Sequence, residues 1–134
     1  MTENTLTLDQ PGAWRQGTCQ ESRPAGTLYD NVYDANYQNR VATAAPVPTL
    51  GLPVSVECAD GYYLYVVGFD SDGAYLGKTN GCTNGWVTSC VADFDGASCL
   101  MLVVRKATNS AISPSEVADA HVAVTLAGGG WLDD

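Results

Sequence analysis

The residues best suited to contact a ligand lie between Tyr29 and Arg40, a stretch without strand or helix periodicity. It interleaves three tyrosines with amides, two carboxylates and an arginine. Tyrosine rings stack on sugar faces, while amide and carboxylate groups hydrogen-bond the hydroxyls. The sequence therefore predicts a ligand-binding loop, and the alternative is a surface loop whose tyrosines pack on a sheet. The candidate ligand-binding residues are Tyr29, Tyr33, Asn36, Tyr37, Asn39 and Arg40.

Calcium is an alternative occupant of this stretch. Asp30, Asn31, Asp34 and Asn36 supply suitable oxygens, but their spacing matches no known calcium loop. The segment Asp70-Ser71-Asp72-Gly73 begins like a calcium loop, yet its twelfth position is a glycine where a bidentate glutamate is required. We therefore expect no metal and no other cofactor.

The sequence offers little for covalent or acid–base catalysis. His121 is the only imidazole, and neither a Gly-x-Ser-x-Gly segment nor a glycine-rich phosphate loop accompanies it. We expect His121 to be an ordinary strand residue. Asp70 with Asp72, and Asp93 with Asp95, each precede a glycine, as in hairpin turns. A glycosidase pair is conceivable, but nothing marks one carboxyl as a raised-pKa acid, so the sequence predicts no enzyme.

The cysteine count favours thiols over disulfides. Five cysteines cannot pair completely within one chain, no Cys-x-x-Cys occurs, and the spacings match no common zinc pattern. We expect mainly free thiols; a single Cys82–Cys90 disulfide and metal binding are the alternatives. The five are Cys19, Cys58, Cys82, Cys90 and Cys99.

Charge and composition exclude several partners. The 134 residues carry six Lys+Arg against fifteen Asp+Glu, a net charge of -9, which disfavours nucleic acid and anionic membrane surfaces. The apolar stretches are too short to span a bilayer, so we expect no membrane insertion. The first residues lack the basic and apolar regions of a signal peptide, so the protein stays where it is made or belongs to a longer chain.

Most of the secondary structure that the sequence predicts around these residues is β-strand. Alternating or β-branched runs predict strands over 52–58, 62–69, 74–76, 86–88, 97–106 and 121–126. The only helical signal is a short turn near 113–119, with Ser113 as N-cap, Pro114 at the first position and Glu116 at the third. The sequence therefore predicts an all-β fold, an antiparallel β-sandwich.

Composition also divides the chain. Residues 1–12 are polar and end in Pro-Gly, which predicts an N-terminal arm or linker. Residues 13–126 form the predicted sandwich domain. Residues 127–134 contain a triple glycine and form a predicted glycine-rich tail.

Several motifs together resemble a small jelly-roll-like β-sandwich of the carbohydrate-binding type. Trp14–Thr18 is similar to its aromatic-x-x-Gly-Ser/Thr opening, and Arg40–Thr43 to its Arg-Ile-Arg-Thr step. Tyr62–Leu76 is similar to its aromatic hairpin around Asp-x-Asp-Gly, and Trp86–Thr88 to its Trp-Thr pair. Leu102–Glu116 is similar to its closing strand and turn.

This module recurs in phage and prophage tail, baseplate and receptor-binding proteins, and beside surface enzymes of gut bacteria. The resemblance covers about Trp14 to Leu126, and Ala42 departs from it where a second arginine is usual. It implies a jelly-roll-like binding or attachment module without catalysis, in the virion (phage tail) or on a bacterial cell surface. The implied partner is a cell-surface glycan or host receptor, and a homo-oligomer, by analogy a trimer, is expected. The alternative is a structural virion or oligomerisation module that binds no small ligand.

Overall fold

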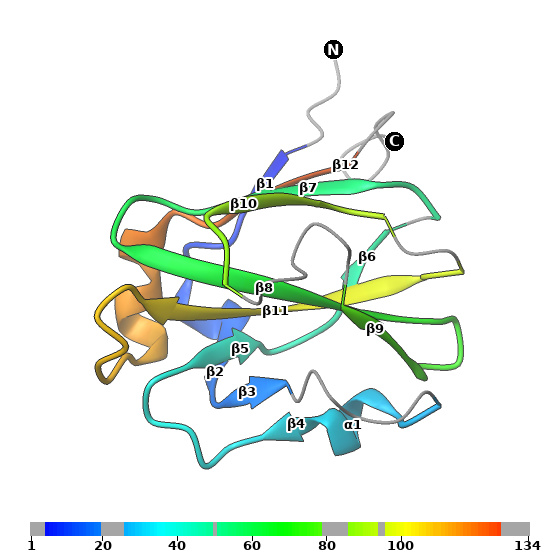
Figure 1. Ribbon diagram of the computed structural model, residues 1–134, viewed down its shortest axis with the longest axis horizontal. Helices are drawn as coiled ribbons and strands as arrows, with labels where there is room; N and C mark the ends of the chain where they lie inside the picture. Colours follow the sequence, from blue (N-terminus) through cyan, green and yellow to red (C-terminus); the bar gives the residue numbers. More distant parts are fainter. Residues whose placement is uncertain (1–4, 20–25, 50, 79–85, 94–95, 127–134) are drawn as a thin grey trace.

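The computed structural model describes residues 5–19, 26–49, 51–78, 86–93 and 96–126. Within them, the strands pair in antiparallel fashion and the two larger sheets face each other (Figure 1). The prediction of an all-β, antiparallel sandwich is therefore confirmed. Among the same residues, no helix has the length and apolar character needed to cross a membrane.

The smaller of the two facing sheets has one buried and one exposed face. In β7 the side chains of Val54 and Val56 are buried while Ser55 and Glu57 are exposed, the period-two pattern of a half-buried strand. The buried side chains belong to the core, and the other face is open to solvent. In spatial order the strands are β1 (Thr5–Thr7), β12 (Ala123–Leu126), β7 (Val54–Glu57) and β10 (Ser89–Ala92).

The larger sheet is built around two strands that are buried on both faces. All side chains from 64 to 69 in β8 and from 100 to 104 in β11 are buried, whichever way they point. These are the two longest apolar runs, which explains why the sequence shows no alternation there. The spatial order is β2 (Trp14–Gln16), β5 (Val41–Thr43), β11 (Cys99–Lys106), β8 (Tyr62–Phe69) and β9 (Tyr75–Lys78), and β6 (Val47–Pro48) also pairs with β11.

A third layer covers the face of the larger sheet that the smaller sheet leaves open. It consists of β3 (Thr18–Cys19), α1 (Tyr29–Val32) and β4 (Tyr33–Asp34), seen below the two sheets in Figure 1. The hydroxyls of Thr18 and Tyr65 lie 2.7 Å apart, and the Tyr65 hydroxyl also donates to the carbonyl of Cys19. These bonds attach the third layer to the Tyr65 side of β8.

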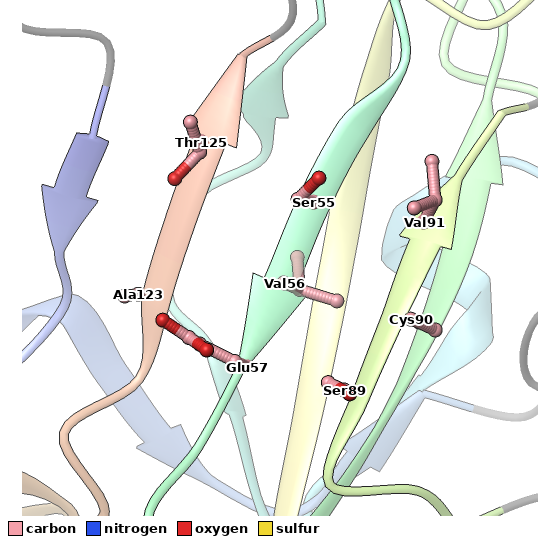
Figure 2. A pocket seen from close by; sticks show the side chains of 8 residues that line it. All are labelled: Ser55, Val56, Glu57, Ser89, Cys90, Val91, Ala123 and Thr125. Atoms are coloured by element: carbon pink, nitrogen blue, oxygen red, sulfur yellow. The ribbon is translucent and has the colours of Figure 1, made fainter.

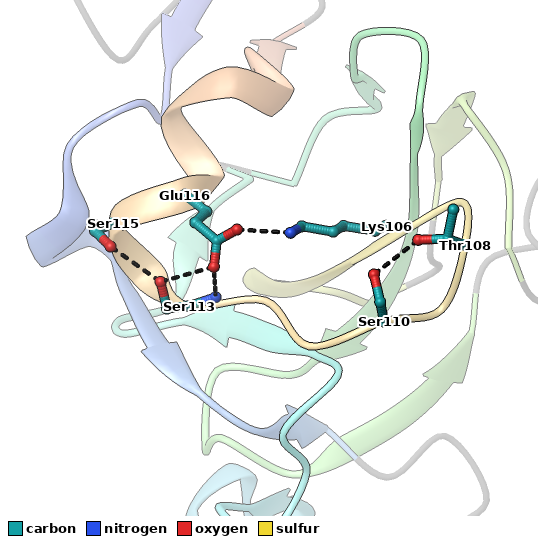
Figure 3. A network of polar contacts seen from close by, with 6 residues as sticks. All are labelled: Lys106, Thr108, Ser110, Ser113, Ser115 and Glu116. Atoms are coloured by element: carbon teal, nitrogen blue, oxygen red, sulfur yellow. Dashed lines mark hydrogen bonds and ion pairs between the residues drawn. The ribbon is translucent and has the colours of Figure 1, made fainter.

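The predicted N-cap is confirmed, although the helix is of the 3-10 type. The helix η3 (Pro114–Ala120) follows Ser113, whose backbone N–H and hydroxyl both donate to the Glu116 carboxylate at 3.1 Å (Figure 3). The same carboxylate lies 2.6 Å from the ammonium group of Lys106, at the end of β11. The charged hydrogen bond between Lys106 and Glu116 holds η3 against the larger sheet. A second 3-10 helix, η1 (Pro11–Ala13), precedes β2.

The N-terminal residues join the sandwich, although the sequence predicts an arm over 1–12. Thr5–Thr7 forms β1 and pairs with β12, with Leu6 opposite Val124, and Leu6 packs against the core. A three-residue strand with one apolar side chain shows no period in the sequence, so its partner strand decides its conformation. The predicted tail, 127–134, lies outside the described residues.

Three further local predictions are wrong in detail. His121 is not in a strand: it ends η3 with a φ of 46°, a left-handed conformation common after a helix, and β12 begins at Ala123. Over 86–88, only Val87 pairs, as an isolated bridge to Leu64. The stretch 29–40, predicted to be a loop because it lacks periodicity, contains α1 and β4, which are too short to produce a period.

Candidate functional site

Three arginines and four aromatic residues form cation–π contacts on the third-layer side of the larger sheet, Arg15 with one ring and the other two arginines with the remaining three rings. We call this set the arginine–aromatic cluster. Half of the six Lys+Arg residues in the chain belong to it. Its members are Arg15, Tyr33, Tyr37, Arg40, Tyr63, Trp86 and Arg105.

Strand register places the arginines of the cluster on this face. Arg15 pairs with Ala42, Ala42 with Val103, and Val103 with Tyr65, so the four side chains form one row across β2, β5, β11 and β8. Directly paired residues in antiparallel strands point to the same side. Since Tyr65 contacts the third layer, Arg15 lies on that side as well. Arg105 pairs with Tyr63 two positions further along β8 and β11, which puts both on the same face.

Trp86 is the centre of the cluster. The guanidinium carbons of Arg40 and Arg105 each lie 4.9 Å from its ring centroid, and the Tyr65 ring centroid lies 4.7 Å away at a tilt of 41°. The neighbouring residue, Val87, exchanges two backbone hydrogen bonds with Leu64, at 2.8 and 2.9 Å. This bridge fixes Trp86 beside β8 although it belongs to no named strand.

Two tyrosines extend the contacts of Trp86 into a row. The Arg40 guanidinium lies 5.0 Å from the Tyr37 ring centroid, and that of Arg105 lies 5.1 Å from the Tyr63 ring centroid. The row therefore runs Tyr37, Arg40, Trp86, Arg105, Tyr63. Each cation–π contact contributes about 0.5–2 kcal/mol, more where water is excluded. These contacts fix the guanidinium planes against rings and leave their N–H edges to find other partners.

Several of those N–H groups have no acceptor. The Nε atoms of Arg15, Arg40 and Arg105, and Nη2 of Arg15, are buried without a hydrogen-bond partner among the residues that the structure describes. One Nη1 contact satisfies Arg40 in part, at 3.4 Å from the Thr18 hydroxyl, and Arg105 donates to the Lys106 carbonyl at 3.1 Å. An unsatisfied buried donor costs about 1–3 kcal/mol, and more when charged. Among the described residues, the guanidinium groups of the cluster are therefore incompletely hydrogen-bonded.

Arg15 contacts a further tyrosine, Tyr33. Its guanidinium carbon lies 3.5 Å from the Tyr33 ring centroid, and the Tyr33 hydroxyl donates to the carbonyl of Gln16. Both the ring and the hydroxyl of Tyr33 are thus held by β2. This arrangement gives Tyr33 a structural role.

The six predicted site residues are only partly brought together. Tyr37 and Arg40 lie in the row around Trp86, and Tyr33 lies under Arg15. The Asn39 amide donates to the Asn109 side chain at 2.9 Å, and Asn36 is exposed. Tyr29 begins α1, and its side chain lies outside the described residues.

The candidate ligand-binding residues predicted from the sequence did not include Arg15, Tyr63, Trp86 or Arg105. Tyr63 and Tyr65 are two positions apart in β8, so the sequence could have placed both side chains on one face of that strand. Arg105 follows the apolar run of β11. The register of β8 with β11 and of β2 with β5 was needed to bring these residues together.

Asp70 and Asp72 lie in a turn, as predicted, whereas Asp95 of the second predicted pair lies outside the described residues. Asp70 Oδ1 accepts hydrogen bonds from the backbone N–H groups of Asp72 at 2.8 Å and Ala74 at 3.0 Å, and Asp34 Oδ1 accepts from that of Asn36 at 2.9 Å. Among the described residues, no group of three or more His, Cys, Asp or Glu side chains is placed to hold a metal ion.

Burial makes two of the thiols weak acids. Burial raises the pKa of Cys19 to about 12, against the opposing effect of nearby Arg15. Burial, with the carboxylates of Asp60 and Glu57, raises the pKa of Cys58 to about 11. Cys19, Cys58 and Cys99 are free thiols. Cys82, and with it the alternative Cys82–Cys90 disulfide, lies outside the described residues.

A shallow groove of about 310 Å³ crosses the exposed face of the smaller sheet. Figure 2 shows small side chains projecting from three neighbouring strands, with Glu57 as the single charged group. No aromatic ring lines it, so it offers no stacking surface for a sugar. Its lining residues are Ser55, Val56, Glu57, Ser89, Cys90, Val91, Ala123 and Thr125.

Of these two places in the described part of the chain, the cluster is the stronger candidate site, because it combines aromatic rings with arginine side chains. Comparisons with family models, curated proteins and solved structures find no match to the chain.

Proposed function

We propose that the chain is a non-catalytic glycan-binding module. The observation that carries this proposal is the row Tyr37, Arg40, Trp86, Arg105, Tyr63, where half-buried rings alternate with guanidinium groups whose Nε atoms have no acceptor among the described residues. Sugars present apolar C–H faces and hydroxyl oxygens, so their recognition needs flat rings beside fixed donors. The row offers both kinds of contact on one face of the larger sheet.

We further propose that binding serves attachment of a phage or prophage tail to a cell-surface glycan. The support for this setting is the resemblance of the motifs to tail and receptor-binding modules. One site of this kind is expected to bind weakly, with a Kd of about 1 μM to 1 mM. A homo-oligomer, a trimer by analogy, would strengthen attachment through avidity.

A glycan array followed by calorimetry with the best ligand tests the proposal. Tyr63→Ala and Tyr37→Ala should each weaken binding at least tenfold, because each removes an end ring of the row. Tyr62→Ala is the matched control: it removes the neighbouring tyrosine of β8, which points to the opposite face and pairs with Lys106. Equal losses in all three variants, or no glycan bound at all, would contradict the proposal.

The alternative is a structural oligomerisation module, favoured by the exposed face of the smaller sheet. Val91 is 53% exposed there, among small side chains that would permit close approach of another surface. Light scattering coupled to size-exclusion chromatography tests this alternative. Val91→Lys should reduce the oligomer to monomer if this face is the interface, and should leave the subunit count unchanged if it is not.

A further inference from the structure

Arg40 and Arg105 lie close together, and among the described residues neither forms an ion pair with a carboxylate. Arg40 and Arg105 both contact the Trp86 ring at 4.9 Å, so their guanidinium carbons lie no further apart than twice that distance. Among the described residues, the ion pair that the structure contains joins Lys106 to Glu116, and none involves Arg15, Arg40 or Arg105. This local excess of positive charge occurs in a chain with a net charge of -9.

Strand pairing makes this proximity obligatory. Val41 of β5 pairs with Val104 of β11, and Arg40 and Arg105 are the next residues outward on these antiparallel strands. Like charges opposite one another on neighbouring strands repel and destabilise the sheet. An anion between the two groups would relieve this repulsion and accept hydrogen bonds from the two guanidinium groups.

We propose that the glycan carries a carboxylate and that Arg40 and Arg105 bind it; this inference rests on the proposed function. The planar guanidinium fork matches the two oxygens of a carboxylate, and stacking on Trp86, Tyr37 and Tyr63 holds each fork in a fixed plane. The ligand class is an acidic sugar, such as a uronic acid. Arg15 adds a third positive charge on the same face of the larger sheet, in β2.

The test compares three ligands that differ at one group: an oligogalacturonate, its methyl ester and the corresponding neutral galactose oligomer. The carboxylate form should bind at least tenfold more tightly than the other two. Its affinity should also fall as the salt concentration rises, because screening weakens contacts between charges. A 6-sulfated galactose oligomer distinguishes carboxylate recognition from attraction to any anion.

Each outcome bears on one proposal or on both. Equal binding of the acid, ester and neutral oligomers overturns the carboxylate inference and leaves glycan binding in place. Equal binding of the sulfated and carboxylated oligomers also overturns it. If none of these oligomers binds while the array identifies another, neutral glycan, the inference falls alone. Absence of any glycan ligand overturns the inference and the proposed function together.

Charge-matched variants locate the contact. Arg40→Gln and Arg105→Gln should each weaken binding of oligogalacturonate at least tenfold, whereas Lys106→Gln removes the same charge outside the cluster and should leave it within twofold. Circular dichroism checks that each variant folds. Arg40→Lys and Arg105→Lys keep the positive charge but lack the planar guanidinium group. They replace the glutamine variants in this test if a glutamine variant does not fold. Unchanged affinity in both lysine variants overturns the assignment of the carboxylate to these two arginines.

Discussion

Gly17 joins β2 to β3 with a φ of +130°, in a region of backbone space that other residues rarely adopt. A Cβ added at this position would overlap the carbonyl oxygen of Asp34 and lie 2.9 Å from Cα of Ala35. Both are backbone atoms of the third layer, so no side chain can rotate away to relieve the overlap. The Gly17 N–H also donates to the Arg40 carbonyl at 2.9 Å, which links this turn to the candidate site.

Gly17→Ala should therefore combine two separate penalties. An unfavourable backbone conformation costs about 1–3 kcal/mol, and overpacking adds about 1–3 kcal/mol. The sum is about 2–6 kcal/mol, and at about 4 °C per kcal/mol for a chain of this size the Tm should fall by about 8–24 °C.

Two other glycines separate the penalties. Gly61 has a φ of +93° with no atom within 4 Å of an added Cβ. Gly61→Ala should therefore lower the free energy of unfolding only by the cost of the backbone conformation, about 1–2 kcal/mol. Gly12 has open space and no positive φ, so Gly12→Ala should be neutral or raise stability by up to about 1 kcal/mol.

Thermal and urea unfolding of the three variants, followed by circular dichroism, measures this series. The expected order of stability is Gly12→Ala, then Gly61→Ala, then Gly17→Ala. Similar melting temperatures for Gly17→Ala and Gly61→Ala would refute the steric argument, since both share a positive φ and only Gly17 is crowded. A changed urea m-value would instead indicate an altered denatured or native state.

Three further predictions follow from burial and charge. The hydrogen bond from the Lys106 ammonium holds the pKa of Glu116 below its usual value of 4.5. This ion pair therefore stabilises the fold above about pH 4.5 and is lost as the pH falls through the folded-state pKa, so Glu116→Gln should flatten the Tm-against-pH curve in that range. The raised pKa values of Cys19 and Cys58, about 12 and 11, predict that neither thiol reacts with a disulfide reagent at pH 8 until the protein unfolds, as a thiol count with and without denaturant will measure. Val103→Asp should abolish folding because it buries a charge in β11, whereas the same change at exposed Val91 should shift stability by about 0.5 kcal/mol or less, as circular dichroism can establish.

The central strands were predictable because their apolar runs are long. The predicted strand over 62–69 coincides with β8, and the predicted 97–106 contains β11. The hairpin turn after β8 and the N-cap of η3 were also predictable, because aspartate, glycine, serine and proline act there through bonds to nearby backbone. Short elements were not: β1 and β4 are too short to show a period, and each is a strand only because it pairs.

The candidate site depended still more on pairing. The sequence by itself determined that tyrosines and an arginine gather between 29 and 40, and that the fold is an antiparallel sandwich. Only the tertiary structure decided that Arg40 of this stretch meets Trp86 and Arg105, which are 46 and 65 positions further along the chain. Local sequence controls side-chain alternation and turns through bonds to near neighbours. The register between strands distant in sequence depends on packing of the whole core, so the face shared by these residues exists only in the folded chain.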